Sequence, residues 1–330
     1  MFRLFATRWR LRIVFFLMTT PDLTFPSASA AAPARIVLAG ATGALGLLIA
    51  HHLRQRGAAV RALVRPQTQD SAEAASLRLQ GVELVAVDYS QADQLRQACE
   101  GAACVVSALS GLREVIVEGQ TRLLEAAVAA DVPRFIPSDF SIDYTKLPEG
   151  SNRNLDLRRE FQRRLDQAPI RATSILNGMF TDLLTGQAPV ILMGLRRVVY
   201  WGDADQPLDF TTMRDTAAFT AAAALDPTTP RYLRVAGEVA SIRGLQAAAQ
   251  AATGQKFKLL RVGSLSAFGK LTSLTKALVP APNEVFPPWQ GMQYLHNMFS
   301  GLPKLEPLDN ARYPDIRWTP VRAVLAAPQA

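Results

Sequence analysis

Short apolar runs alternate with amphipathic stretches through the first half of the chain. The runs have the length and composition of buried parallel strands, and glycine, proline or polar residues bound them. They cover residues 36–39, 58–64, 82–87, 103–109, 134–136 and 170–176. Between them, apolar residues repeat at the helical period over residues 45–56, 71–79, 112–130 and 154–167, and a further helix starts near residue 91. Strands and helices in alternation predict an α/β fold, a doubly wound parallel sheet with right-handed crossovers.

The turn after the first strand carries the clearest chemical signal. GATGALG, residues 40–46, joins a buried strand to a helix, which is the context in which a glycine motif indicates dinucleotide binding. Gly40 permits the tight turn, Gly43 lets backbone N–H groups approach a pyrophosphate, and Gly46 lets the helix pack close to the strand. The spacing is G-x-x-G-x-x-G rather than G-x-G-x-x-G, so a turn that binds nothing is the alternative.

The pattern becomes less regular in the second half. Short strands are predicted over residues 200–202, 208–211 and 231–237, helices over residues 212–225 and 241–254, and prolines interrupt residues 280–288. We therefore expect three parts. They are an N-terminal extension (residues 1–33), a Rossmann-type NAD(P)-binding domain (residues 34–188), and a smaller C-terminal α+β substrate lobe (residues 189–330) whose segments can interleave with that domain.

Polar residues follow the predicted strands at the edge where open α/β sheets bind ligands. Arg65 lies nineteen positions after Gly46, about where an acidic residue would hold the ribose 2′-hydroxyl of NAD. A guanidinium pairs bidentately with phosphate, so this position favours NADP over NAD; a solvent-facing arginine is the alternative. Asp88 is predicted to lie beside the adenine or to cap the following helix. The small residues Ser107 and Ala108 would let the middle of the cofactor lie against the backbone.

Composition excludes several function classes. The formal net charge is +8, but residues 1–30 hold +3 of it, and the rest of the chain has no basic stripe for nucleic acid. Two cysteines, Cys99 and Cys104, form neither a disulfide framework nor a metal motif, so we expect no metal. Outside the leader, no stretch approaches the ~20 apolar residues of a membrane span. We expect a soluble protein.

The leader has some features of a secretory signal. Four arginines precede an apolar run over residues 13–18, and small residues follow at 27–31. The run is at or below the usual length of such a region, and no twin-arginine pair is present. Because a reduced nicotinamide pool is cytosolic, we expect a leader without export function and a cytoplasmic protein. Translation could start at Met1 or at Met18.

Five motifs, taken in order, resemble the NmrA-like family of atypical short-chain dehydrogenases/reductases, which are related to the isoflavone-reductase-like enzymes. They are GATGALG, LVR after the second strand, RFIPSDF after the fifth, TSILNGMF after the sixth, and NARYPDIRWTP near the end, and the resemblance covers about residues 35–325. It implies an NADP(H)-binding domain with a small C-terminal lobe that closes over the substrate. The residues it implies around the cofactor are Gly40, Thr42, Gly43, Ala44, Leu45 and Gly46 at the pyrophosphate, Arg65 at the 2′-phosphate, Ser107 and Ala108 at the middle, and Ser138, Phe140, Asn177 and Phe180 at the nicotinamide.

The chain departs from that family at the expected catalytic position. Isoflavone-reductase-like enzymes carry a lysine on the helix after the fifth strand, and here Arg158 stands there. Arginine stays protonated near neutral pH, so it stabilises charge but does not serve as a general acid or base. The Tyr-x-x-x-Lys pair of the wider superfamily is missing, which leaves Tyr144 and Lys146, on a predicted loop over residues 141–152, as further candidates. Without the resemblance, the arginines of this helix indicate a solvated surface.

Two functions remain open on the sequence alone. The first is an NADPH-dependent oxidoreductase that passes hydride to a small carbonyl, enone or quinone, with Arg158 stabilising the developing oxyanion. Its substrate would be aromatic or quinone-like, lined by aromatics of the second half, although most of those residues are expected to be core. The second is a sensor that binds NADP(H) without turnover and acts through a protein partner, which the missing lysine and tyrosine would suit. A homo-oligomer is compatible with both.

Overall fold

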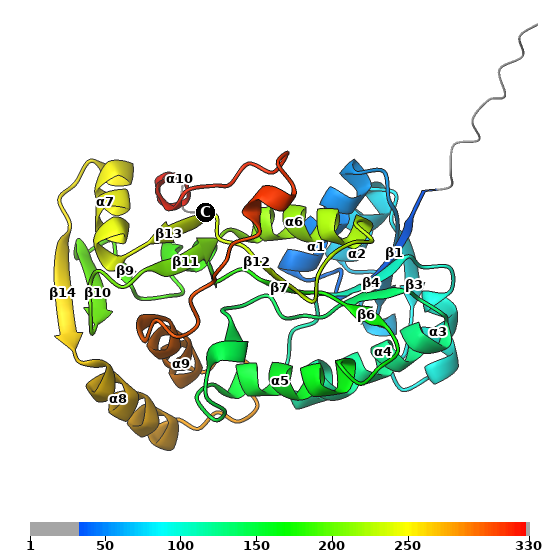
Figure 1. Cartoon of the computed structure of the whole chain (residues 1–330), viewed down its shortest axis with the longest axis horizontal. Coiled ribbons are helices and arrows are strands. Elements are labelled where there is room, and N and C mark those ends of the chain that lie inside the picture. The colour runs from blue at the N-terminus through cyan, green and yellow to red at the C-terminus, as the bar shows by residue number, and fades with distance from the viewer. Residues whose placement is uncertain (1–32, 328–330) are drawn as a thin grey trace, which may run out of the picture. The chain divides into compact units, whose positions relative to one another are not determined.

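Six parallel strands form the sheet at the centre of the first half of the chain (Figure 1). They are β1 (Arg35–Ala39), β2 (Ala59–Val64), β3 (Glu83–Ala86), β4 (Cys104–Ser107), β5 (Arg134–Ile136) and β6 (Arg171–Ala172). Their order is β3-β2-β1-β4-β5-β6, and every neighbouring pair is parallel. The predicted doubly wound sheet is therefore confirmed. The order reverses between β1 and β4, and this reversal is where such sheets bind dinucleotides.

The computed structural model describes residues 33–327, which form one unit. The predicted leader and the choice between Met1 and Met18 lie outside the described residues. Within the described range, no helix is long and apolar enough to cross a membrane.

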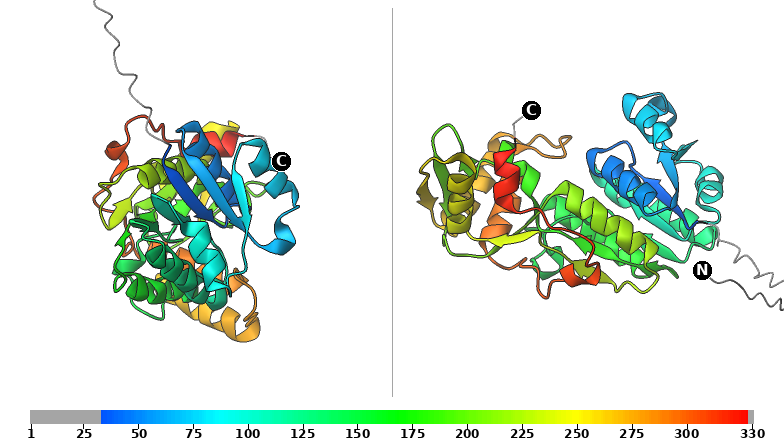
Figure 2. Two further views of the ribbon diagram at one scale, coloured as in Figure 1. Left: turned by 90° about the vertical axis from the view of Figure 1, so that its right-hand side faces the viewer. Right: turned by 90° about the horizontal axis from the view of Figure 1, so that it is seen from above.

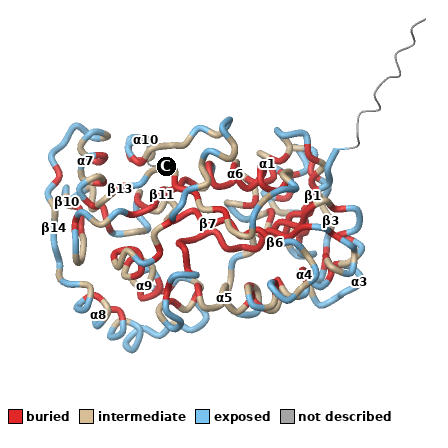
Figure 3. The backbone as a smooth tube through the Cα atoms, viewed as in Figure 1, coloured by how far each residue is buried: buried red, intermediate tan, exposed pale blue. Residues whose placement is uncertain are grey.

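Helices cover both faces of the sheet because its strands are apolar on both sides (Figures 1 and 3). Ile36 and Leu38 of β1 pack with α1 (Ala44–Gln55), α2 (Ala72–Leu79) and α6 (Met213–Leu225). Val37 and Ala39 point to the other face, toward α3 (Ala92–Cys99), α4 (Gln120–Ala129) and α5 (Arg153–Leu165). Although α6 belongs to the second half of the sequence, it packs along α1. The two halves therefore interleave, and the boundary at residue 188 stays a prediction.

Two predicted elements are divided in the structure. The helix expected over residues 112–130 begins with a π-helical segment, Glu114–Gly119, before α4. The strand expected over residues 170–176 is split at Thr173. The Thr173 N–H donates to Phe135 beside β6, whereas the next N–H, that of Ser174, donates to Arg231. From that point β7 (Ser174–Leu176) pairs with β12 (Tyr232–Arg234) instead of β5.

The second half forms two small sheets and four helices around a core of its own (Figure 2). One sheet contains β8 (Met179–Phe180), β11 (Leu208–Thr211) and β13 (Glu238–Ala240), and the other contains β9 (Ile191–Leu192), β10 (Arg197–Trp201) and β14 (Lys258–Gly263). The helices are α7 (Ile242–Thr253), α8 (Leu265–Leu278), α9 (Pro288–Phe299) and α10 (Val321–Ala326). Sequence periodicity did not identify β14, α8 or α9. Strand β14 lies at a sheet edge and is largely exposed, so it lacks the alternation that predicts a strand.

The predicted loop over residues 141–152 is only partly a loop. Residues 141–144 are buried, and a short 3₁₀ turn spans Tyr144–Lys146. Ile142, Tyr144 and Leu147 belong to the core of the second half. The segment contains no α-helix or strand, as the loop prediction requires, but these three apolar side chains bury its first part in the core.

The chain near its C-terminus returns to the central sheet. We call residues 309–319 the strap. The Asp309 N–H donates to Arg234 of β12, and Tyr313 and Trp318 pack on Phe219 of α6. At its end, the Thr319 N–H donates to the Asp215 carboxylate at 2.7 Å. The strap therefore ties the C-terminal part of the chain to helix α6.

Candidate active site at the carboxyl edge of the sheet

The turn after β1 allows three segments to come unusually close together. Gly40 has φ +74°, and a Cβ there would lie 2.6 Å from the carbonyl oxygen of Ala108. A Cβ at Gly46 would overlap the carbonyl oxygen of Gly40. Both positions therefore require glycine. Gly40 has a left-handed backbone conformation, and at Gly46 helix α1 packs directly against the end of β1. These are the packing roles that the motif predicts.

Gly43 has a different environment. Its φ is −77°, and the nearest atom to an added Cβ is 3.4 Å away, so sterics alone do not demand glycine. It is the N-cap of α1, and no side chain caps that helix end. The first N–H groups of α1 therefore point outward from the positive end of the helix dipole, beside the reversal in strand order. This arrangement suits an anion such as a pyrophosphate.

Several buried polar atoms make no hydrogen bond with the described residues, and one of them, in Ser107, lies at the same edge. Ser107 is paired in register with Ala39, so its hydroxyl lies one residue from the glycine turn. That hydroxyl is buried and makes no hydrogen bond with the described residues. Asn177 follows β7, and its side-chain oxygen and nitrogen are also buried without a hydrogen-bond partner among the described residues. The same holds for the hydroxyl of Thr181. Such groups in a folded protein call for a partner, and a polar cofactor along this edge would provide one.

Arg65 and Asp88 also lie at the carboxyl ends of their strands. The side chain of Arg65 is exposed, and its guanidinium forms no hydrogen bond or ion pair within residues 33–327. It is therefore available to a phosphate. Asp88 accepts from the Ser90 N–H at 2.8 Å, a bond that lowers its pKa. Helix α3 has Gln91 as its N-cap, so the alternative that Asp88 caps this helix was wrong.

Ser138 connects the glycine turn to Arg158. Its hydroxyl donates to Leu109 at 2.6 Å, and the Leu109 backbone lies against Gly40. Its carbonyl accepts from Arg158 Nε at 3.0 Å, and its N–H donates to Gln120 at 3.0 Å. All polar groups of Ser138 are therefore engaged by protein. Its predicted neighbour at the nicotinamide end, Phe140, is buried in the core beneath α1 and α6.

Arg158 is held on the inner side of α5. Besides Ser138, it donates from Nη1 to the carbonyl oxygen of Asn154 at 3.2 Å. Tyr294 of α9 lies beside its guanidinium. Burial raises the pKa of the Tyr294 hydroxyl, while the charge of Arg158 acts in the opposite direction. A phenol and a permanent cation are thus placed together, although the tyrosine comes from a helix that the sequence pattern did not predict.

Tyr144 is connected to this site through a buried carboxylate. Its hydroxyl donates to Asp139 Oδ2 at 2.9 Å, and the hydroxyl of Ser174 donates to the same oxygen at 2.6 Å. Burial raises the pKa of Asp139, and the bonds from Ser174 and Tyr144 and the charge of Arg158 oppose that shift. Tyr144 is fully buried, and burial raises its own pKa well above the ordinary value. It therefore stays protonated and holds Asp139.

Lys146 lies apart from these groups. Its Nζ donates to the carbonyl oxygen of Lys304 at 2.6 Å and is 3.8 Å from the carboxylate of Asp143. These bonds join the short 3₁₀ turn to the segment after α9. The neighbouring arginine of α5, Arg159, is equally engaged, since it donates to the carbonyls of Tyr144 and Leu147. The expectation of a uniformly solvated arginine surface on α5 was therefore wrong for its inner side.

Comparison with known proteins agrees with this architecture. A model of the NmrA-like family matches residues 33–307. Pinoresinol reductase 1 of Arabidopsis thaliana is 29% identical over 59% of this chain and 66% of its own length. The isoflavone reductase homolog IRL of Zea mays is 31% identical over 58% of this chain and 65% of its own length. The chain thus matches just under two thirds of the length of these curated relatives.

Similarity in structure extends further along the chain. Leucoanthocyanidin reductase from Vitis vinifera, in its binary complex with NADPH, covers 88% of this chain and 98% of its own with a TM-score of 0.71. At 19% identity this likeness shows a shared fold. The family match spans most of the chain and includes the glycine turn, Ser138 and Arg158. This chain belongs to the NmrA-like family.

Proposed function

We propose that this protein is an NADPH-dependent reductase that passes hydride to a small carbonyl, enone or quinone. The observation that carries the proposal is the continuous set of contacts from Gly40 through Leu109 and Ser138 to Arg158. It connects a turn suited to a pyrophosphate with a cation that can stabilise a developing oxyanion. The reductases among the relatives support this class of reaction.

The cofactor is NADP(H), which supplies the hydride. The uncapped N-terminus of α1 would hold the pyrophosphate, and Arg65 would pair with the 2′-phosphate. Ser107 and Asn177 would donate or accept hydrogen bonds along its middle and at the nicotinamide end. Burying these unpartnered groups against a polar ligand removes the cost of leaving them unsatisfied.

Arg158 and Tyr294 divide the work that a lysine does in the related enzymes. Arg158 stays charged and would lower the energy of negative charge on the substrate oxygen or, for an enone, on the enolate. The phenol of Tyr294 is protonated at neutral pH, so its hydroxyl could give a proton to that oxygen. Burial raises its pKa, which makes it a weaker acid, and the charge of Arg158 opposes that shift. Ser138 and Asn154 are positioning residues, because their carbonyls fix the guanidinium.

The substrate is an aromatic or quinone-like small molecule, a class suggested by the aromatic substrates in the names of the relatives. We place its action in the cytoplasm, where the pool of nicotinamide cofactor is kept reduced. The alternative of a sensor without turnover has no support from the relatives, which are named as reductases. Turnover therefore decides between the two.

The test measures NADPH binding by fluorescence and its consumption at 340 nm with a panel of quinones and aromatic enones. We expect binding and turnover of at least one panel member. Arg158→Ala should lower kcat about 10²-fold or more, as loss of an oxyanion donor does, and Arg158→Lys should retain more activity. Arg163→Ala, which removes an exposed arginine of the same helix, is the control.

Tight binding without turnover of any panel member would contradict the reductase and favour the sensor. Turnover that is unchanged in both Arg158 variants would remove Arg158 from the mechanism but leave the reductase standing. Failure to bind NADPH at all would overturn the assignment of the glycine turn.

A further inference from the structure

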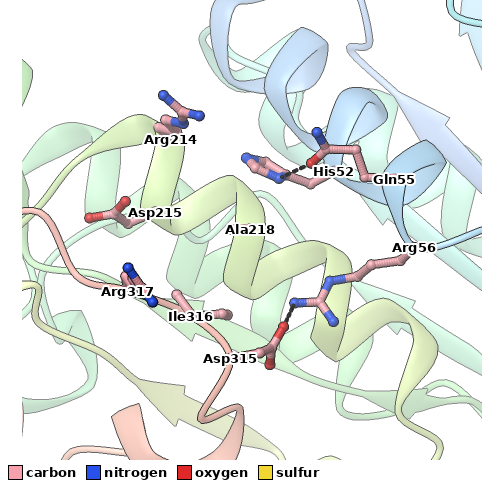
Figure 4. A pocket seen from close by; sticks show the side chains of 9 residues that line it. All are labelled: His52, Gln55, Arg56, Arg214, Asp215, Ala218, Asp315, Ile316 and Arg317. Carbon is pink, nitrogen blue, oxygen red and sulfur yellow. Dashed lines mark hydrogen bonds and ion pairs between the residues drawn. The ribbon is translucent and has the colours of Figure 1, made fainter.

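A cavity lies at the opposite end of α1 from the glycine turn (Figure 4). It has a volume of about 360 Å³, which is within the range of small-molecule sites. Helix α1 runs from Ala44 to Gln55, so its two ends are roughly 17 Å apart at 1.5 Å per residue. The cavity is therefore separate from the proposed cofactor site. Three segments meet around it: the end of α1, the start of α6, and the strap.

Arginines from all three segments line this cavity. They are Arg56 after α1, Arg214 in the first turn of α6, and Arg317 in the strap. Figure 4 shows the lining side chains arranged around Ala218 of α6, with α1 on one side and the strap on the other. Because these arginines are far apart in sequence, only the folded chain brings them to one place.

Two carboxylates line the cavity, and only one of them is paired with an arginine there. Asp215 uses both oxygens for Thr319, accepting from its N–H at 2.7 Å and from its hydroxyl at 3.1 Å. Asp315 pairs with Arg56 at 2.6 Å. Arg214 and Arg317 have no carboxylate within ion-pair distance in the described part of the chain. Two guanidinium groups therefore remain available at one cavity.

Two further observations favour an anion at this cavity. Arg214 occupies the first turn of α6, where the helix dipole disfavours a cation by about 0.3–1 kcal/mol. His52 of α1 is one of the lining residues, and its Nε2 is buried without a hydrogen-bond partner among the described residues. Burial lowers the pKa of His52, and the charges of His51, Arg214 and Arg56 lower it further. An anion would compensate both features.

We propose that this cavity is a binding site for a small organic phosphate, distinct from the cofactor site. The planar forks of Arg214 and Arg317 match the oxygens of a phosphate, which each can grip through two bonds. The cavity exceeds what one phosphate group needs, and Ala218 and Ile316 give it an apolar part for the organic portion of the ligand.

The test titrates the full chain, saturated with NADP⁺, with phenyl phosphate in a calorimeter. Phenol controls for the ring and inorganic phosphate for the anion. The variant Arg214→Gln with Arg317→Gln should weaken phenyl phosphate binding at least tenfold. The control variant, Arg163→Gln with Arg243→Gln, removes the same charge from exposed sites on α5 and α7 and should leave Kd within twofold.

Three results would overturn the proposal: no saturable binding of phenyl phosphate, equal weakening in both double variants, or binding of inorganic phosphate alone. Arg214 and Arg317 are exposed, so folding should survive, and Arg317→Gln alone carries the test if the double variant does not fold. The comparison of variants needs no cofactor. If the glycine turn proves not to bind NADP⁺, the titration can be repeated without the cofactor. A failure of the proposed cofactor site is therefore distinguishable from a failure of the proposed phosphate site.

Discussion

At the residue scale, the carboxyl edge of the sheet contains two kinds of polar residue. Ser138 has every polar group bonded to protein, so it positions Arg158 and connects it to β4. Ser107, Asn177 and Arg65 have polar groups that no described residue engages. The sequence assigns all of them to the cofactor in the same way. The hydrogen bonds of the structure distinguish the residues that hold the site together from the residues that remain available to a ligand.

Arg65 gives the sharpest test at this scale. If its guanidinium pairs with the 2′-phosphate, Arg65→Ala should weaken NADP⁺ binding about 10- to 100-fold, the loss of a charge-assisted bond, and change NAD⁺ binding less than twofold. Fluorescence titration with both dinucleotides measures this. Arg78→Ala, an exposed arginine of α2 that contacts Asp70, should affect neither. Equal weakening of both cofactors by Arg65→Ala would refute the assignment.

At the element scale, helix α1 takes part in two sites. Its N-terminus faces the sheet edge without a side-chain cap, and its last turn lines the arginine-rich cavity. Helix α9 contributes Tyr294 to Arg158 from a part of the chain more than a hundred residues later. Packing against the core sets the position of each helix and so decides which site its side chains reach. The local sequence predicts helix α1 and the glycine turn at its start, but it predicts neither α9 nor the cavity at the other end of α1.

The two glycines of the α1 turn should respond differently to alanine. Gly46→Ala forces a Cβ into the carbonyl of Gly40, so we expect the free energy of unfolding to fall by about 1–3 kcal/mol, as in overpacked cores. Gly43→Ala has room and should cost less than about 1 kcal/mol, from the poorer N-cap. We expect it still to weaken NADPH binding, because a methyl group at the N-cap would crowd the backbone N–H groups proposed to hold the pyrophosphate. Urea unfolding and NADPH titration of both variants separate the effects, and equal stability losses would contradict the argument.

At the scale of the whole molecule, the strap joins the C-terminal part of the chain to the central sheet. Asp226, at the end of α6, accepts from Tyr313 at 2.9 Å and from Arg312 at 2.9 Å. Burial alone would raise the pKa of Asp226, but hydrogen bonds from Thr228, Arg312 and Tyr313 hold it well below the ordinary value. The same strap places Arg317 at the arginine-rich cavity.

This carboxylate predicts how stability depends on pH. The pKa of Asp226 is lower in the folded chain than in the unfolded chain, so its ionised form stabilises the fold. This contribution to the free energy of unfolding is complete above the unfolded pKa of about 4 and is lost as the pH falls below that value. Asp226→Asn should lower the free energy of unfolding at pH 7 by about 1.5 kcal/mol. It should also make the loss of stability between about pH 4 and 2 less steep. Asp205→Asn, which breaks an exposed pair with Arg243, is the control and should do neither. If the free energy of unfolding falls with pH equally steeply in Asp226→Asn and in the native chain, the prediction is contradicted.

The sequence by itself determined the central sheet, the glycine turn and the family. Strand periods, glycine positions and N-caps are local properties, so β1, α1 and the carboxyl edge could be derived without a structure. The partners of Arg158, the burial of Tyr144 and the cavity around Ala218 could not be derived in this way. They depend on contacts between segments far apart in the chain, including α9 and the strap, and side-chain period does not specify which elements pack together. Only the tertiary structure therefore decided which arginines are held by protein and which remain available to a ligand.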